Sequence, residues 1–362
     1  MTASLTERAA RTSDLHISRI EPLPSPRELL EELPASPAAL EHVERSREAV
    51  RAALLGIDDR PLVVVGPCSI HDVGAALEYA RRLASVADRL RDKLLVVMRT
   101  YFEKPRTTVG WKGLVNDPHL DGSHDIATGL RRARRFLRDV VDLGLPTSTE
   151  FLEPISPQYL ADLISWGAIG ARTAESQIHR QLASGLSMPI GFKNGTDGSL
   201  DVALDGCTAA AAAQSFLGID PEGRAALVRT SGNPDTHVIL RGSSSGPNYS
   251  AEHVRAATER LRSAGMPARV MVDASHGNSG KDHVRQQAVA HEIAEQIAAE
   301  RSAGESMLAG VMLESFLVGG AQKFDPRPDH PPLTYGQSVT DACLSWDATV
   351  EILEHLADAV SH

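Results

Sequence analysis

From residue 61 onward, short apolar runs alternate with longer stretches whose apolar positions recur every three or four residues. The short runs lack strict apolar–polar alternation, which is typical of strands buried on both faces of a parallel sheet. Eight runs are predicted as strands: 62–67, 94–102, 145–151, 168–172, 189–194, 237–242, 269–276 and 310–316. Helices are predicted over 75–91, 126–143, 157–165, 201–216, 251–263, 284–299 and 341–360.

Strand–helix alternation repeated eight times favours an α/β fold of the (β/α)8 TIM-barrel type. A doubly wound open sheet is the alternative, because periodicity does not reveal whether a sheet closes. Residues 1–60 are interpreted as an N-terminal extension, with a proline-rich breaker at 22–26 followed by helical patterns over 27–33 and 37–55. The predicted division is therefore an arm with helices over 1–60 and a catalytic barrel over 61–362.

Composition excludes several classes of protein. The 362 residues carry 37 Lys and Arg against 47 Asp and Glu, a net charge of −10, which disfavours a nucleic-acid binder. Three cysteines are too few for a disulfide framework and indicate a reducing compartment. No apolar run approaches the ~18 residues of a membrane span, and the N-terminus lacks a signal-peptide pattern. We therefore expect a cytoplasmic protein without a membrane partner.

Polar and reactive residues follow the predicted strands, and in a barrel the carboxyl ends of the strands form the catalytic face. In chain order these residues are Cys68, Arg99, Glu150, Arg172, Lys193, Arg241, His276 and Glu314. Any one of them could simply begin a loop, but eight at eight strand ends predict a site.

Six cations gather near these ends: Arg99, Lys104, Arg106, Arg172, Lys193 and Arg241. Arginine forks suit carboxylates and phosphates, and lysine adds a point charge. The cluster predicts one or two substrates that carry several negative charges. For Arg106 and Arg172 individually, an ion pair with a neighbouring acid is the alternative.

A second subset combines sulfur, nitrogen and oxygen ligands: Cys68, His276, Glu314 and, at the start of the predicted last helix, Asp341. This mixed set fits Mn²⁺, Fe²⁺, Co²⁺ or Zn²⁺ better than Mg²⁺. Such an ion would act as a Lewis acid on a carbonyl group. Other histidines, among them His71, are expected to be solvated.

At these residues the sequence resembles the type I DAHP (3-deoxy-D-arabino-heptulosonate 7-phosphate) synthases, the class I DAHP synthetase family. The resemblance runs from about residue 13 to the C-terminus. It is carried by residues 66–72 (GPCSIHD), 99–113 (RTYFEKPRTTVGWKG), 167–173 (GAIGART), 191–198 (GFKNGTDG), 239–242 (ILRG), 273–276 (DASH), 314–317 (ESFL) and 335–346 (YGQSVTDACLSW).

The resemblance implies a metal-dependent condensation of phosphoenolpyruvate with erythrose 4-phosphate, the first step of the shikimate pathway. It implies Cys68, His276, Glu314 and Asp341 as metal ligands, with Cys68 and His276 also counted among the catalytic residues. It implies phosphoenolpyruvate contacts from Arg99, Lys104, Arg172, Lys193 and Arg241. Lys104, Pro105, Arg106 and Thr107 would face erythrose 4-phosphate, with Lys104 the candidate proton donor to the new alkoxide.

The resemblance also implies regulation and assembly. Ser187, Phe216 and Gly218 occupy positions that tend to form inhibitor sites, and with the N-terminal arm they suggest a homodimer or homotetramer. The inhibitor could be Phe, Tyr, Trp or none. Two alternatives remain: a related 3-deoxy-ulosonate-phosphate synthase that uses another aldose phosphate, and a non-catalytic regulatory paralogue.

Overall fold

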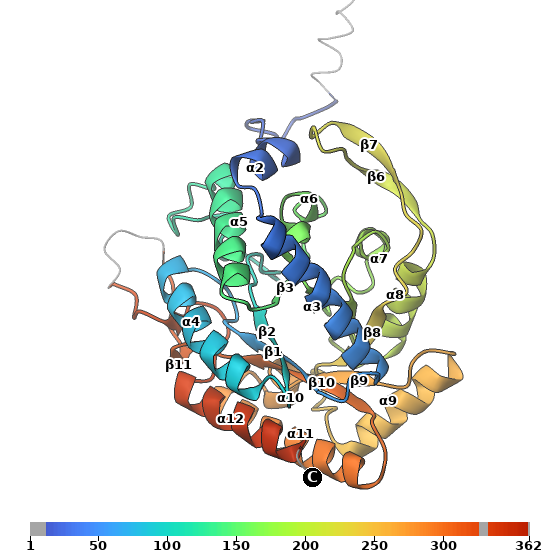
Figure 1. Ribbon diagram of the computed structural model, residues 1–362. Helices are drawn as coiled ribbons and strands as arrows, with labels where there is room; N and C mark the ends of the chain where they lie inside the picture. Colours follow the sequence, from blue (N-terminus) through green and yellow to red (C-terminus); the bar gives the residue numbers. More distant parts are fainter. Residues whose placement is uncertain (1–11, 326–331, 361–362) are drawn as a thin grey trace, which may run out of the picture.

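A closed barrel of parallel strands forms the centre of the computed structural model, which describes residues 12–325 and 332–360 (Figure 1). The strand order around the barrel is β1-β10-β9-β8-β5-β4-β3-β2, and β1 pairs with both β2 and β10. The strands are β1 (Leu62–Gly66), β2 (Leu95–Arg99), β3 (Thr147–Glu150), β4 (Trp166–Ile169), β5 (Ile190–Lys193), β8 (Thr236–Leu240), β9 (Val270–Asp273) and β10 (Leu308–Glu314). The predicted barrel is confirmed, and the open sheet is excluded.

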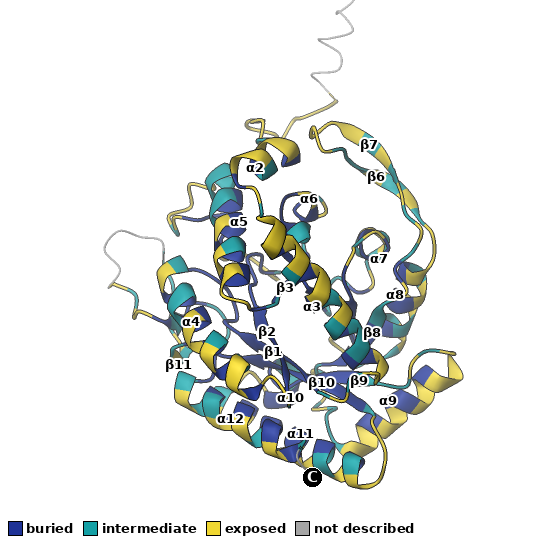
Figure 2. Cartoon of the chain, viewed as in Figure 1, coloured by how far each residue is buried: buried dark blue, intermediate teal, exposed yellow. Residues whose placement is uncertain are grey.

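Helices surround the barrel, and along the longer ones buried and exposed positions alternate because their apolar faces point inward (Figure 2). They are α4 (Val73–Leu90), α5 (Ile126–Asp142), α6 (Pro157–Leu160), α7 (Gln177–Ala183), α8 (Asp201–Ala211), α9 (Ala251–Ser263), α10 (His276–Ser279), α11 (His283–Ser302) and α12 (Trp346–Ala359). Side chains cap several of these helices; Asp72, for example, accepts from the N–H of Ala75 at the start of α4.

The helix predicted over 201–216 is too long. Helix α8 ends at Ala211, because Ala212 is extended (φ −88°, ψ 152°), and Phe216 belongs to an antiparallel hairpin of β6 (Ser215–Ile219) and β7 (Ala225–Arg229). The alanine run favours helix intrinsically, but pairing with a strand ten residues further along overrides that propensity. The hairpin stands outside the barrel wall, where its residues are exposed or half-buried.

The last helix begins later than the sequence predicts. Ser345 is the N-cap of α12 and its hydroxyl accepts from the N–H of Ala348. Asp341 therefore lies in the loop before the helix rather than at its start. The backbone of that loop is tied to the barrel, since the N–H of Leu344 donates to the carbonyl of Glu314 at 2.8 Å.

Two helices precede the barrel, α2 (Pro26–Glu32) and α3 (Pro37–Leu55). Helix α3 crosses the barrel at the amino end of the strands (Figure 1). Its Val50, Ala53 and Leu54 pack in one cluster with residues such as Leu62 and Leu95, which point into the barrel from the first positions of β1 and β2. This closes the amino end and leaves the carboxyl end open. Of the helices within 12–325 and 332–360, none has the length and apolar character to cross a membrane.

Candidate active site

The eight residues predicted at strand ends do lie at the carboxyl end of the barrel. Arg99, Glu150, Lys193 and Glu314 are the last residues of β2, β3, β5 and β10. Cys68, Arg172, Arg241 and His276 follow β1, β4, β8 and β9 by one to three residues. Barrel closure therefore brings residues nearly 250 positions apart onto one face.

A possible metal site lies on this face. The ligand atoms of Cys68, Glu314 and Asp341 all lie within 4.8 Å of one another; Cys68 and Glu314 are buried and Asp341 is half-buried. His276 directs Nε2 toward the same place, 3.9 Å from Glu314 Oε1. One thiol, two carboxylates and an imidazole fit a divalent transition ion in both number and chemistry.

Asp273 holds the ring of His276 in this orientation. The Nδ1 of His276 lies 2.8 Å from Asp273 Oδ2, which leaves Nε2 free to face Glu314. His276 has a left-handed backbone (φ +53°), a costly conformation for a residue with a Cβ, at the first position of α10. Burial alone would raise the pKa of Asp273, but His276 and Lys193 hold it well below its ordinary value. Asp273 is thus a charged anchor for one metal-site residue and one cation.

Lys104 connects the metal-site residues with the adjacent cavity. Its Nζ donates to the carbonyl oxygen of Cys68 at 3.0 Å and lies 3.2 Å from Cys68 Sγ. Burial would lower the pKa of Lys104, but its electrostatic interactions with Cys68 and Glu314 outweigh burial and raise that pKa. The side chain is therefore a buried ammonium group at the edge of the site.

Arg99 lies beneath this layer. Its guanidinium donates to Glu314 Oε1 at 3.0 Å and to Met312 Sδ at 2.9 Å, and it stacks 3.8 Å above the ring of Tyr101. Arg99 is fully buried and is not among the residues that line the cavity. In this structure it orients Glu314 from below.

The cavity beside the metal-site residues holds more positive than negative side chains. It measures about 90 Å³, and its charged lining consists of Lys104, Arg106, Arg172, Lys193, Arg241, Lys281, Glu150, His276 and Asp341. The nitrogen atoms of Arg106 and Arg172 bond to backbone carbonyls of Trp111 and Pro105, and no ion pair joins either to an acid in the described part of the chain. The alternative that they serve as ion-pair partners finds no support there.

Of the predicted KPRT segment, Lys104, Pro105 and Arg106 line the cavity, whereas Thr107 is exposed and does not. Two charged lining residues had been given no role from the sequence. Lys281 donates to Asp341 Oδ1 at 3.1 Å, and its only sequence signal is its position in the loop after His276. Glu150 had been noted at a strand end; its Oε1 is buried and has no hydrogen-bond partner among the described residues.

The predicted regulatory residues come together only in part. Phe216 and Gly218 of strand β6 line a separate cavity of about 380 Å³, together with Ile178 and Leu182 of helix α7. Ser187 is exposed and does not line this cavity. The sequence had placed Phe216 in a helix, so the hairpin that forms one wall was not anticipated.

Comparison with known proteins bears directly on this arrangement. A model of the DAHP synthetase I family matches residues 38–354. The chain belongs to the DAHP synthetase I family. Across 358 residues it is 55% identical to a phospho-2-dehydro-3-deoxyheptonate aldolase of Corynebacterium glutamicum, covering 98% of this chain and 96% of that protein.

Other relatives match this chain over a similar length. A Phe-sensitive phospho-2-dehydro-3-deoxyheptonate aldolase of Escherichia coli K12 is 54% identical over 350 residues, covering 97% of this chain and 98% of the relative. Further relatives are named Trp-sensitive or tyrosine-inhibited. The solved structure of the Francisella tularensis aldolase superposes with a TM-score of 0.91 at 49% identity, covering 95% of this chain and 98% of that one.

Proposed function

We propose that this protein is a DAHP synthase, which condenses phosphoenolpyruvate with D-erythrose 4-phosphate to give DAHP and inorganic phosphate. The observation that carries the proposal is the cavity rich in lysine and arginine that adjoins Cys68, Glu314 and Asp341. The two substrates together carry two phosphates and one carboxylate, which matches the surplus of cations. Erythrose 4-phosphate carries an aldehyde, the kind of group that a bound metal ion polarises. Membership of the DAHP synthetase I family supports the same reaction.

The cations would divide between the substrates. Lys193, Arg172 and Arg241 line the cavity and would hold the phosphate and carboxylate of phosphoenolpyruvate. Arg106, beside Pro105 and Lys104, would face the phosphate of erythrose 4-phosphate. This placement brings C3 of phosphoenolpyruvate against the aldehyde carbon and replaces an encounter in solution by a fixed geometry.

A divalent ion held by Cys68, His276, Glu314 and Asp341 would supply Lewis acidity toward the aldehyde oxygen. As C3 bonds to the aldehyde carbon, that oxygen gains negative charge, and Lys104 Nζ donates the proton that makes it a hydroxyl. Positive charge develops at C2, where water adds. Glu150, with its unpartnered Oε1, is placed to accept a proton from that water. The bond from C2 to the phosphate oxygen then breaks as the new C2 hydroxyl gives its proton to the departing phosphate, which leaves the C2 ketone of DAHP.

A turnover assay with phosphoenolpyruvate and erythrose 4-phosphate tests the proposal, with arabinose 5-phosphate as the competing aldose. We expect DAHP and phosphate in equal amounts from the first pair and little product from the second. A preference for arabinose 5-phosphate would indicate the related synthase. The absence of turnover with every metal of the series Mn²⁺, Fe²⁺, Co²⁺ and Zn²⁺ would indicate a non-catalytic paralogue.

We also propose that the cavity of Phe216 and Gly218 binds an aromatic amino acid, in keeping with the names of the relatives. The N-terminal region adjoins the hairpin that forms this cavity, since the N–H of Arg27 donates to the carbonyl of Pro221 at 2.8 Å, and Arg27 Nε donates to Glu222 at 2.7 Å. This contact supports a regulatory role for residues 1–60 beside the catalytic barrel of 61–362. Leu217 and Leu227 of the hairpin are exposed, which supports a homo-oligomer assembled through this face.

A further inference from the structure

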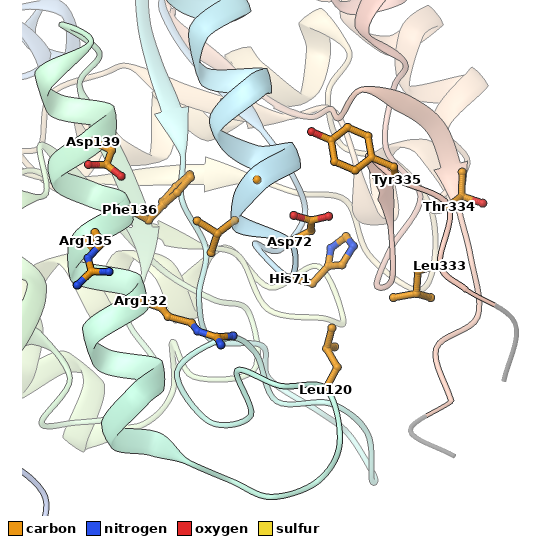
Figure 3. Close-up of a pocket in the computed structure, with 12 residues that line it drawn as sticks. His71, Asp72, Leu120, Arg132, Arg135, Phe136, Asp139, Leu333, Thr334 and Tyr335 are labelled. Atoms are coloured by element: carbon orange, nitrogen blue, oxygen red, sulfur yellow. The ribbon is translucent and has the colours of Figure 1, made fainter. Parts of the chain in front are cut away.

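A third cavity, of about 500 Å³, lies between the start of helix α4, helix α5 and the segment 333–335 (Figure 3). None of its lining residues lines the active-site cavity or the hairpin cavity. Its volume is in the range of sites for small organic molecules. The proposed reaction makes no use of it.

Hydrogen bonds hold the walls of this cavity in place. Arg132 of α5 donates to the carbonyl of Pro118 at 2.6 Å and so fixes the loop that carries Leu120. Gln322 exchanges two hydrogen bonds with the backbone of Thr334, at 2.8 and 2.9 Å. The hydroxyl of Tyr335 donates to Glu78 of α4 at 2.9 Å. These hydrogen bonds fix the positions of the segments that form the walls of the cavity.

One wall presents a cation, Arg135, that forms no ion pair within the described ranges, although its charge acts on Asp139 one turn along the same helix. Helix α5 carries four arginines in the run RRARR at 131–135. Arg131 pairs with Glu32, Arg134 pairs with Asp162, and Arg132 holds Pro118. Arg135 lines the cavity and makes no hydrogen bond or ion pair with any residue in the described ranges. It is available to an anion.

The facing wall presents a carboxylate and an imidazole, each with one atom that has no hydrogen-bond partner among the described residues. Asp72 caps α4 through Oδ1, which accepts from the N–H of Ala75 at 3.0 Å, and its Oδ2 has no partner among the described residues. His71, expected from the sequence to be solvated, is in fact only 6% exposed. Its ring packs against Phe316, and its buried Nδ1 has no hydrogen-bond partner in the part of the chain described. A buried polar atom without a partner is costly, and it points to a missing ligand or water.

Apolar side chains also line the cavity: Leu120, Phe136 and Leu333. In Figure 3, Phe136 lies between Arg135 and Asp72, whereas Leu120 lies below His71 and Leu333 lies to its right, on the side away from Arg135. Asp139 adds a second carboxylate. A phosphate ester or a dicarboxylate is disfavoured, because Asp72 and Asp139 would repel it.

We propose that this cavity binds a small zwitterion with an apolar body, the chemistry of an apolar α-amino acid. Its carboxylate contacts Arg135 and Arg132, its ammonium group contacts Asp72, and its side chain covers Leu120 and Leu333. This site is separate from the hairpin cavity of Phe216 and does not depend on it.

Calorimetric titration of the full chain with L-phenylalanine tests the site, alongside 3-phenylpropionate, which lacks the ammonium group, and 2-phenylethylamine, which lacks the carboxylate. In Arg135→Ala we expect binding at this site to weaken at least about tenfold, the usual effect of losing a hydrogen bond to a charged group. Arg138→Ala is the matched control, because Arg138 is on the same helix but does not line the cavity. In Asp72→Asn the helix cap is kept, and we expect phenylalanine to lose affinity while 3-phenylpropionate does not.

All titrations are repeated in a Phe216→Ala background, so that any binding to the hairpin cavity is reduced. If the hairpin proposal fails, Phe216→Ala leaves phenylalanine binding unchanged while Arg135→Ala still removes it, so the two proposals fail separately. Equal phenylalanine affinity in Arg135→Ala and Arg138→Ala would overturn the proposal. So would binding of 3-phenylpropionate or inorganic phosphate as tightly as phenylalanine, or no binding of any probe.

Discussion

Lys104 Nζ lies 3.0 Å from the carbonyl oxygen and 3.2 Å from the sulfur of Cys68, so one ammonium group contacts a residue of the possible metal site and also lines the substrate cavity. Like the bond from Arg99 to Glu314 Oε1 at 3.0 Å, it joins the two subsets of residues that the sequence had separated by chemistry, but Arg99 does not line the cavity. This contact makes Lys104 the group best placed to move a proton where metal and aldehyde meet.

Replacing Lys104 by methionine keeps the length of the side chain and removes the proton. We expect kcat to fall by about 10²–10⁴-fold, the usual contribution of a general acid. Metal content, measured by atomic emission on the same sample, should change little. A kcat within a few-fold of the original would show that another group donates the proton.

Removal of the metal should abolish the activity. We expect EDTA to inactivate the enzyme and added Mn²⁺ to restore it. In Asp341→Asn, metal affinity should fall by at least about 10-fold, because losing the charge of a direct ligand should cost no less than losing a partner behind a ligand, which costs about 10–100-fold. Asp347→Asn serves as the control, because Asp347 lies in the first turn of α12, away from the cavity. Equal Mn²⁺ affinity in the two variants would remove Asp341 from the ligand set.

Glu103 is a buried acid that makes stability depend on pH. Its carboxylate accepts from Ser156 Oγ at 2.8 Å and from the N–H of Glu153 at 3.3 Å, and burial raises its pKa to about 8. Because the folded state holds this proton more tightly than the unfolded state does, its contribution to stability is lost as pH rises from about 4.5 to about 8.

Glu103→Gln removes this titration and keeps a neutral side chain of the same shape. We expect the original protein to lose stability relative to Glu103→Gln as pH rises. The difference between their free energies of unfolding should change by up to a few kcal/mol between pH 5 and 8. Urea unfolding at the two pH values measures the difference. A constant difference between the two proteins would mean that Glu103 does not titrate in this interval.

Arg134 links α5 to the N-terminal helices and to helix α6. Its guanidinium bonds both oxygens of Asp162, at 2.7 and 2.8 Å, and the carbonyls of Leu33 and Tyr159, and it is 1% exposed. Arg134→Met leaves these acceptors unpaired, and we expect a loss of about 3–5 kcal/mol. Arg135→Ala, one residue along the same helix, should change the melting temperature little. Similar melting temperatures for the two variants would contradict the stabilising role of Arg134.

The sequence by itself determined the eight strand–helix units and much of the candidate site, whereas the tertiary structure decided that the sheet closes into a barrel. Eight apolar runs, each separated from the next by a longer connection, are local signals, and residues at their carboxyl ends must meet once the sheet closes. The positions of Cys68, Glu314, Lys193 and Arg241 were therefore available from the pattern alone. The family motifs added roles to those positions.

Only the tertiary structure decided the rest, because it depends on contacts between distant parts of the chain. The hairpin of Phe216 replaced a predicted helix, since strand pairing outweighed the helix propensity of the alanine run. Arg99 was placed beneath Glu314 rather than in the cavity, and Thr107 outside it. His71 is buried beside a cavity whose walls come from three distant segments, and no local pattern encodes a space of that kind.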